Sequence, residues 1–178
     1  MGTEVFSRNI RSKTILSPLY RTMRTPRIVR HGAMYHVGAR ANRGEFIFEH
    51  DETKELFLDV VKEAKKRFRF RIKNFCIMGN HVHLLLWPDP DESLSKIMQW
   101  ILSVFAIRFN HRFHLKGHVW YDRFRSVLIA SLRQFIAAFE YVSRNPVKAT
   151  LVDRPTDYRY NGVRHIRDGD FSVIDRKK

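Results

Sequence analysis

Two histidines, His81 and His83, stand one residue apart near the middle of this 178-residue chain. Residues 81–87 (HVHLLLW) are mostly apolar, and Pro88 cannot extend a β-ladder, so this stretch is predicted to be a strand. Side chains alternate across a strand, so the two imidazoles share one face and the apolar residues Val82 and Leu84 share the other. Neutral imidazoles placed in this way can bind one divalent cation. The alternative is a pair of partly exposed histidines on the edge of a sheet.

A second residue suited to chemistry is Tyr141, in a segment with helical periodicity. Ser131 and Gln134 form a capping box that predicts the helix start, and Pro146 predicts an end near Asn145. Tyr141 falls opposite the apolar stripe of this helix, with Asn145 on its own face. A tyrosine kept for packing would lie on or beside the stripe, whereas the alternative is an ordinary exposed tyrosine. The stripe that we expect in the core is Leu132, Phe135, Ile136, Phe139 and Val142.

The remaining elements supply the frame for these groups. Alternation and turn residues predict further strands at residues 34–41, 72–78 and 126–130, with a hairpin at residues 79–80. Apolar residues at helical spacing predict helices at residues 53–68 and 94–112. The order strand, helix, strand, strand, helix, strand, helix predicts an α+β fold. This is a ferredoxin-like βαββαβ antiparallel sheet with helices on one face, plus a C-terminal helix that carries Tyr141.

The composition limits the possible partners. Apolar residues make up 44% of the chain, which is enough for one domain with a real core, and the formal net charge is +15. Such an excess of cations indicates a polyanionic partner, and the absence of a long apolar run or signal-peptide core argues against a membrane. The single cysteine, Cys76, excludes an intrachain disulfide and is expected in the core. We therefore expect a cytoplasmic protein associated with the nucleoid.

The chain divides into three parts. Residues 1–25 read as a basic arm that we expect to be flexible, residues 26–160 as the domain, and residues 161–178 as a basic, irregular tail packed on it. The loop at residues 111–125 is dense in His, Arg and aromatic residues, which suits single-stranded nucleic acid. The alternative is that Trp120 and Phe124 only anchor this loop. The basic cluster at residues 65–73 is either a solvated surface or a phosphate-binding one.

Four landmarks carry a resemblance to a known family. The histidine pair within residues 78–86 (MGNHVHLLL) resembles the HUH motif of the IS200-like transposases. Residues 141–148 (YVSRNPVK) resemble the tyrosine and Asn-Pro signature of the REP-associated branch, and residues 120–124 (WYDRF) its Trp-x-x-Arg-Phe segment. Pro26-Arg27 and residues 35–37 (YHV) resemble its usual start. Ser143 and Arg144 depart from the hydrophobic or aromatic residues common before Asn-Pro.

The resemblance implies a single-tyrosine enzyme that nicks and transfers single-stranded, often hairpin-forming, DNA. In this reading His81, His83 and Asn145 bind Mg²⁺ or Mn²⁺, and Tyr141 is the nucleophile that forms a 5′-phosphotyrosine link. The enzyme would act as a monomer or a homodimer. Two alternatives remain: a non-catalytic module that binds hairpin DNA or RNA, and a hydrolytic metallonuclease. The residues expected to contact DNA are Arg40, Arg43, Arg123, Arg125 and Lys148.

Overall fold

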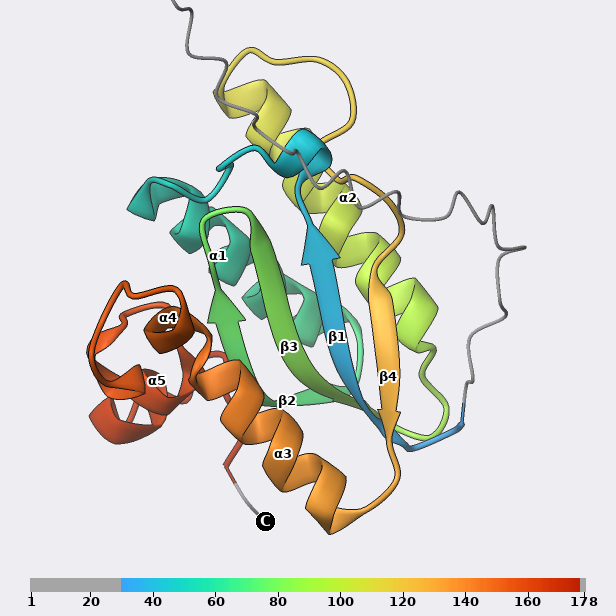
Figure 1. The fold of residues 1–178 in the computed structure, drawn as a ribbon. Helices are drawn as coiled ribbons and strands as arrows, with labels where there is room; N and C mark the ends of the chain where they lie inside the picture. Colours follow the sequence, from blue (N-terminus) through green and yellow to red (C-terminus); the bar gives the residue numbers. More distant parts are fainter. Residues whose placement is uncertain (1–29, 177–178) are drawn as a thin grey trace, which may run out of the picture.

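A four-stranded antiparallel sheet forms the centre of the molecule (Figure 1). The structure is a computed structural model and describes residues 30–176, so the basic arm predicted at residues 1–25 lies outside the described residues. The strands run in the order β2-β3-β1-β4, which confirms the ferredoxin-like α+β prediction. Their bounds are β1 (Met34–Arg40), β2 (Phe70–Ile77), β3 (His81–Pro88) and β4 (Arg125–Ile129).

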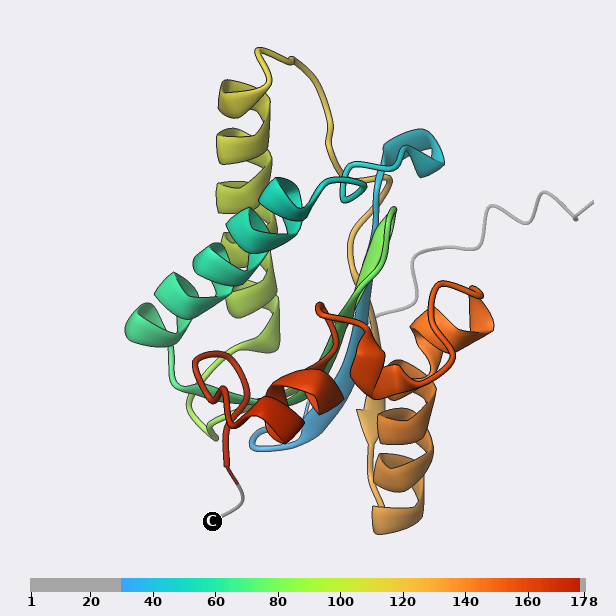
Figure 2. The ribbon, with the colours of Figure 1, turned by 90° about the vertical axis from the view of Figure 1, so that its left-hand side faces the viewer.

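Helices α1 (Asp51–Arg67) and α2 (Leu94–Arg112) cover one face of the sheet, as Figure 2 shows. Each helix carries apolar residues at helical spacing, and the strands present alternate side chains to them. Val37 of β1 and Leu84 of β3 are buried in this core together with Phe57 and Phe105, whose rings meet at 5.5 Å between centroids. The main core therefore lies on the face opposite the two histidines.

Helix α3 (Leu132–Ser143) lies on the other face, and its packing differs from the sequence prediction. Of the five residues expected in the core only Val142 is buried, in a small cluster with Cys76, Met78 and Leu85. Phe135 and Phe139 are partly buried, whereas Leu132 and Ile136 are exposed. The reason is position: α3 starts beside the edge strand β4, and only its C-terminal half lies over β2 and β3 (Figure 1).

The C-terminal segment, residues 158–176, packs on the domain, as expected for the tail predicted at residues 161–178, but it is not irregular throughout. It contains helix α5 (Gly162–Asp168), and its residues Val173 and Ile174 are buried in the main core. It follows the free edge of β2: the Ile77 amide donates to the carbonyl of Tyr160 at 3.0 Å, and the Asp175 amide donates to the carbonyl of Ile72 at 2.9 Å. An uncovered edge strand invites pairing with other chains, and this segment satisfies the edge of β2 internally. The remaining short helices are α4 (Asn145–Lys148), η1 (Asn42–Gly44) and η2 (Pro155–Asp157).

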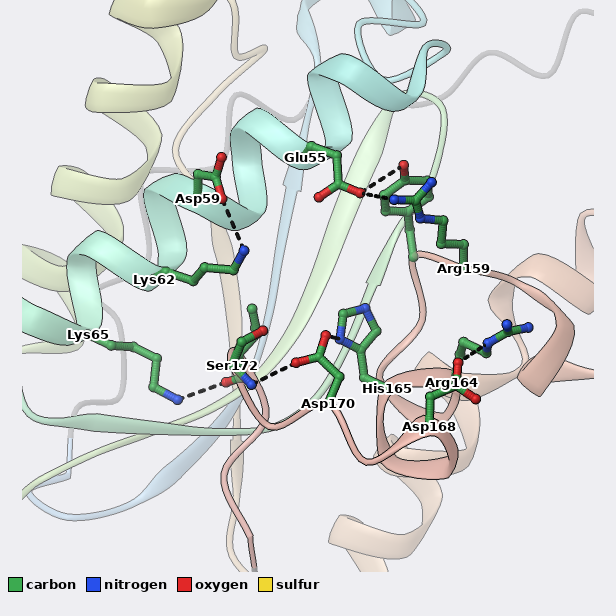
Figure 3. A network of polar contacts seen from close by, with 12 residues as sticks. Glu55, Asp59, Lys62, Lys65, Arg159, Arg164, His165, Asp168, Asp170 and Ser172 are labelled. Carbon is green, nitrogen blue, oxygen red and sulfur yellow. Dashed lines mark hydrogen bonds and ion pairs between the residues drawn. The ribbon is translucent and has the colours of Figure 1, made fainter.

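Ion pairs hold the C-terminal segment against α1 (Figure 3). Lys65 at the end of α1 donates to Asp175 at 2.6 Å, and Arg159 donates to Glu55 at 2.8 Å. Part of the basic cluster at residues 65–73 is therefore paired with carboxylates and does not form unpaired positive charge on the surface. Further pairs of α1, the basic cluster and the C-terminal segment include Lys62 with Asp59, Arg69 with Asp89 and Asp91, Arg71 with Asp89, Arg159 with Asp51, Arg164 and Arg167 with Asp168, Arg167 with Asp157, and His165 with Asp170.

Two expectations from composition can be compared with the described residues. Cys76 is buried as expected, and burial raises the pKa of its thiol. Within residues 30–176 no helix is both long enough and apolar enough to cross a membrane.

Candidate active site

The two histidines of β3 lie side by side on the face that α3 partly covers. The ring centroids of His81 and His83 are 5.0 Å apart, while Val82 and Leu84 point into the main core, so the predicted alternation is confirmed. Both imidazoles line a cleft of about 830 Å³ that is open to solvent. The strand thus places two nitrogen donors together at the wall of a cleft that has the volume of a typical ligand-binding site.

Helix α3 brings Tyr141 to the same place. Its side chain is 43% exposed and lines the cleft, and its ring centroid lies 5.5 Å from that of His83. The ammonium of Lys148, in α4, lies 4.8 Å from the centroid of the Tyr141 ring. The tyrosine and the histidines, far apart in sequence, therefore meet within one chain.

A buried polar network fixes the end of α3 that carries Tyr141. Asn74 of β2 is fully buried, and its amide donates to the carbonyl of Phe139 at 3.1 Å and to Oγ of Ser143 at 2.9 Å. Asn161 donates to the carbonyl of Ser143 at 2.7 Å. Buried polar groups are stable only when they are paired, so this network specifies where the helix ends. The serine that departs from the usual family pattern is the residue that Asn74 binds.

Asn145 begins α4 directly after this turn and lies beside both Tyr141 and His81. Its Nδ2 donates to the carbonyl of Tyr141 at 2.8 Å, which leaves its amide oxygen free to accept. The Asn145 side chain lies near enough to His81 to oppose the lowering of the His81 pKa that burial and Arg40 cause. The structure therefore brings together all four residues that the sequence argument placed in the site: His81, His83, Tyr141 and Asn145.

The environment keeps the imidazoles neutral. Burial lowers the pKa of His83 to about 3, and the neighbouring His36 and His81 contribute to this lowering. Burial, with the charge of Arg40, also lowers the pKa of His81 and outweighs the opposing effect of Asn145. Only the neutral ring has a free lone pair for a metal, so both histidines are in the form that binds cations.

His36 of β1 is a member of the site that the sequence argument did not single out. Its Nε2 lies 3.0 Å from Nδ1 of His83, and its ring centroid lies 5.5 Å from that of Tyr141. Burial lowers its pKa. The alternation of residues 34–41 places His36 on one sheet face, but only the register of β1 against β3, in which Gly38 pairs with His83, brings the two rings together.

The donors present suit a hard or borderline divalent cation. The described residues contain no group of three His, Cys, Asp or Glu side chains that could hold a metal, so a third ligand beside the two histidines would be of another type. The Asn145 oxygen beside His81 is such a donor, and two imidazoles with one amide oxygen are compatible with Mg²⁺ or Mn²⁺. A set of this kind leaves positions for substrate oxygens.

Arginines surround the histidines without acidic partners. Arg40, Arg43, Arg123 and Arg125 line the cleft, and none of the four forms an ion pair within residues 30–176. Lys148 does not line the cleft and lies instead over Tyr141.

The loop at residues 111–125 is anchored by its two aromatic residues and presents other side chains to the cleft. Trp120 donates from Nε1 to the carbonyl of Leu102 at 2.9 Å and Phe124 is buried, so these two rings anchor the loop. Between them Tyr121 is 69% exposed and lines the cleft together with Arg123. The anchored rings therefore hold a polar and aromatic turn at the mouth of the cleft.

Comparisons with known proteins identify the family and the fold of the chain. The family model described as "Transposase IS200 like" matches residues 29–145. A protein of Haemophilus influenzae, whose name places it provisionally among the REP-associated tyrosine transposases, is 23% identical over 128 residues, covering 62% of this chain and 73% of that protein. A solved REP-associated tyrosine transposase bound to a REP hairpin has the same fold, with a TM-score of 0.68 and 19% identity over 86% of this chain and 90% of that one. The chain belongs to the IS200-like transposase family.

Proposed function

We propose that this protein is a metal-dependent enzyme that nicks and rejoins single-stranded DNA through a covalent bond to Tyr141. The observation that carries the proposal is the convergence of Tyr141 and two neutral histidines at one cleft, with Asn145 near His81. A module that only binds nucleic acid requires no such group. Hairpin-forming DNA is the proposed substrate, because the structural relative is bound to a REP hairpin and the cleft of this chain carries arginines that have no acidic partner within residues 30–176. A single chain brings together every proposed group, so the proposal requires no second subunit.

The chain's own residues account for the covalent step. The phenol oxygen of Tyr141 attacks the phosphorus, the bond from phosphorus to the 3′ oxygen breaks, and the DNA 5′-phosphate becomes attached to the tyrosine. The phenol proton passes to solvent, and the leaving 3′ oxygen takes up a proton to become a hydroxyl. Since the new bond is also a phosphodiester, another 3′-hydroxyl can reverse the step and join two strands without ATP.

The charged residues have distinct proposed roles. Arg40, Arg43, Arg123 and Arg125 bind the phosphates that flank the scissile one, because they face the cleft without acidic partners. Lys148, with its ammonium 4.8 Å from the ring centroid, favours negative charge on Tyr141 or on the phosphate beside it.

His81, His83 and the amide oxygen of Asn145 would hold the cation. When bound, Mg²⁺ or Mn²⁺ supplies Lewis-acid stabilisation of the charge that develops on the non-bridging phosphate oxygens. The His81 ring is suited to this role because its Nδ1 lies 2.7 Å from Oδ1 of Asn80, an acceptor, which leaves Nε2 with its lone pair.

A covalent adduct is the decisive test. The protein is incubated with Mn²⁺ and an end-labelled single-stranded oligonucleotide that contains a hairpin, and the products are separated on a denaturing gel. We expect a labelled protein band that Tyr141→Phe reduces by at least about 10³-fold, because the nucleophile is removed. Tyr121→Phe is the matched control: it alters another exposed tyrosine of the same cleft and should retain the adduct.

The other outcomes identify the alternatives. Cleavage without an adduct would indicate a hydrolytic metallonuclease. Binding of the hairpin with neither cleavage nor adduct would indicate a non-catalytic module. An adduct that survives Tyr141→Phe would remove Tyr141 from the mechanism, whatever the enzyme does.

A further inference from the structure

Each metal-facing histidine has one polar neighbour at its Nδ1, and the two neighbours differ. Nδ1 of His81 lies 2.7 Å from Oδ1 of Asn80, and Nδ1 of His83 lies 3.0 Å from Nε2 of His36. The Asn80 amide is fixed by a second bond, since its Nδ2 donates to the carbonyl of Gly44 at 3.3 Å. His81 must therefore donate from Nδ1. Between Nδ1 of His83 and Nε2 of His36 the geometry allows either nitrogen to carry the shared proton.

The ring nitrogen of His83 that carries the proton decides whether this histidine can bind a cation. A neutral imidazole carries one N–H and one lone pair, so one ring of the pair donates and the other accepts. If His83 donates from Nδ1 to His36, then Nε2 of His83 keeps its lone pair. If His36 donates instead, the proton of His83 stands on Nε2 and blocks it.

His36 is not placed to act as a third ligand itself. Its Nε2 is already turned to His83, and the part of the chain that the structure describes has no three-membered cluster of His, Cys, Asp or Glu fit for a metal. The three rings instead form a row, with centroids 5.0 Å apart between His36 and His83 and again between His83 and His81. His36 lines the cleft beside His83 and touches that ring through Nδ1, which is the position of a residue that orients a ligand.

We propose that His36 is a positioning residue that accepts the Nδ1 proton of His83 and so holds that ring in the tautomer whose Nε2 can bind a divalent cation. Asn80 does the same for His81. The role of the cation in catalysis rests on the proposed function, but the tautomer is a property of the metal-free protein. Removal of an orienting partner of this kind typically costs about 10- to 100-fold in metal affinity.

Nitrogen NMR of the metal-free protein labelled with ¹⁵N-histidine tests the proposal directly. In the wild type we expect His81 and His83 to carry their protons on Nδ1. In His36→Phe, which keeps a ring but has no acceptor, His83 should shift toward the Nε2–H form. Mn²⁺ affinity, measured by electron paramagnetic resonance, should fall about 10- to 100-fold. His36→Gln supplies an amide oxygen and should restore most of both properties, and His118→Phe, an exposed position, should change neither.

Two results would overturn the assignment. One is a wild-type His83 with its proton on Nε2, which needs no variant and so does not depend on the variants folding. The other is a folded His36→Phe protein with unchanged tautomer and unchanged Mn²⁺ affinity. If the tautomers are as expected but no DNA adduct forms, the nicking proposal fails while the role of His36 stands.

Discussion

The cleft and the C-terminal segment both contain several arginines, but these arginines differ in whether they are paired with carboxylates. The cleft arginines Arg40, Arg43, Arg123 and Arg125 have no ion pair within the described residues. In the C-terminal segment, by contrast, Arg159 and Arg164 each meet a carboxylate (Figure 3), and so does Arg167. The comparison shows that the +15 charge of the chain is not one surface property. One region leaves cations available to a polyanion, and the other uses them to attach its own chain.

The largest expected effect lies in the C-terminal segment. Ile174 is only 2% exposed, so Ile174→Ala should lower the free energy of unfolding by about 2–5 kcal/mol, because apolar burial decreases and a cavity remains. Urea unfolding measures this. Ile166→Ala, at a position in α5 that is 41% exposed, is the matched control and should cost less than about 1 kcal/mol.

The same pair of variants tests whether the two regions are separate. At a temperature where Ile174→Ala is still folded, its affinity for hairpin DNA should equal that of the wild type, because Ile174 contacts the main core and not the cleft. A parallel loss of DNA affinity in the folded variant would mean that the C-terminal segment belongs to the binding surface.

As the pH falls, the cleft should lose its contribution to the free energy of unfolding before the C-terminal segment does. An unfolded histidine takes up a proton near pH 6.5, whereas the folded His83 does so only near its lowered pKa of about 3. Between these values the unfolded state binds more protons, so stability falls as the pH falls, by up to about 1.4 kcal/mol per pH unit for this group. Hydrogen bonds from Ser172 lower the pKa of Asp170, so the carboxylate of the C-terminal segment loses its contribution only at still more acidic pH, below about 4.

Urea unfolding of the metal-free protein at several pH values between 7 and 4 checks this. His83→Gln removes one titrating group and should make the curve less steep, with the lowered pKa values of His36 and His81 accounting for the slope that remains, while His118→Gln, at an exposed position, should follow the wild type. If wild type and His83→Gln lose stability in parallel, the buried ring is not the source of the acid sensitivity.

Local patterns predicted the parts of the site that depend on one element at a time. Alternation along residues 81–87 placed His81 and His83 on one face, and helical periodicity placed Tyr141 away from the apolar stripe. The contacts between elements could not be read in the same way. His36 meets His83 only through the register of β1 against β3, and Asn74 binds Ser143 from a strand whose register shifts between Ile72 and Asn74.

Periodicity also shows which face is apolar without showing what covers it. The stripe of α3 is real, but Leu132 and Ile136 are exposed because the N-terminal half of the helix lies beside the edge of the sheet. The opposite error occurs in the C-terminal segment. Val173 and Ile174 stand as two apolar residues in a polar stretch, with no period to reveal them, yet they complete the core because the chain returns along β2.

The smallest effect is the one that tests the comparison most directly, by removing equal charge from each region. Arg40→Ala/Arg123→Ala removes two cleft cations, and Arg159→Ala/Arg164→Ala removes two paired ones. Binding of a fluorescent hairpin oligonucleotide is followed by anisotropy over a range of KCl concentrations, in EDTA so that no metal contributes. For the cleft variant we expect the slope of log affinity against log salt to fall by about 0.7 for each phosphate that the protein no longer neutralises. Affinity should fall up to about five-fold per arginine, because an exposed ion pair is worth at most about 1 kcal/mol.

The paired variant should leave both the affinity and the salt slope unchanged, because its arginines are already neutralised by Glu55 and Asp168. The two variants have the same net charge, so a general attraction between a basic protein and DNA would weaken equally in both. Equal losses would therefore show that DNA senses total charge alone. A loss confined to the cleft variant would show that DNA binds the unpaired arginines of the cleft, and that the carboxylates of Glu55 and Asp168 neutralise the competing arginines of the C-terminal segment.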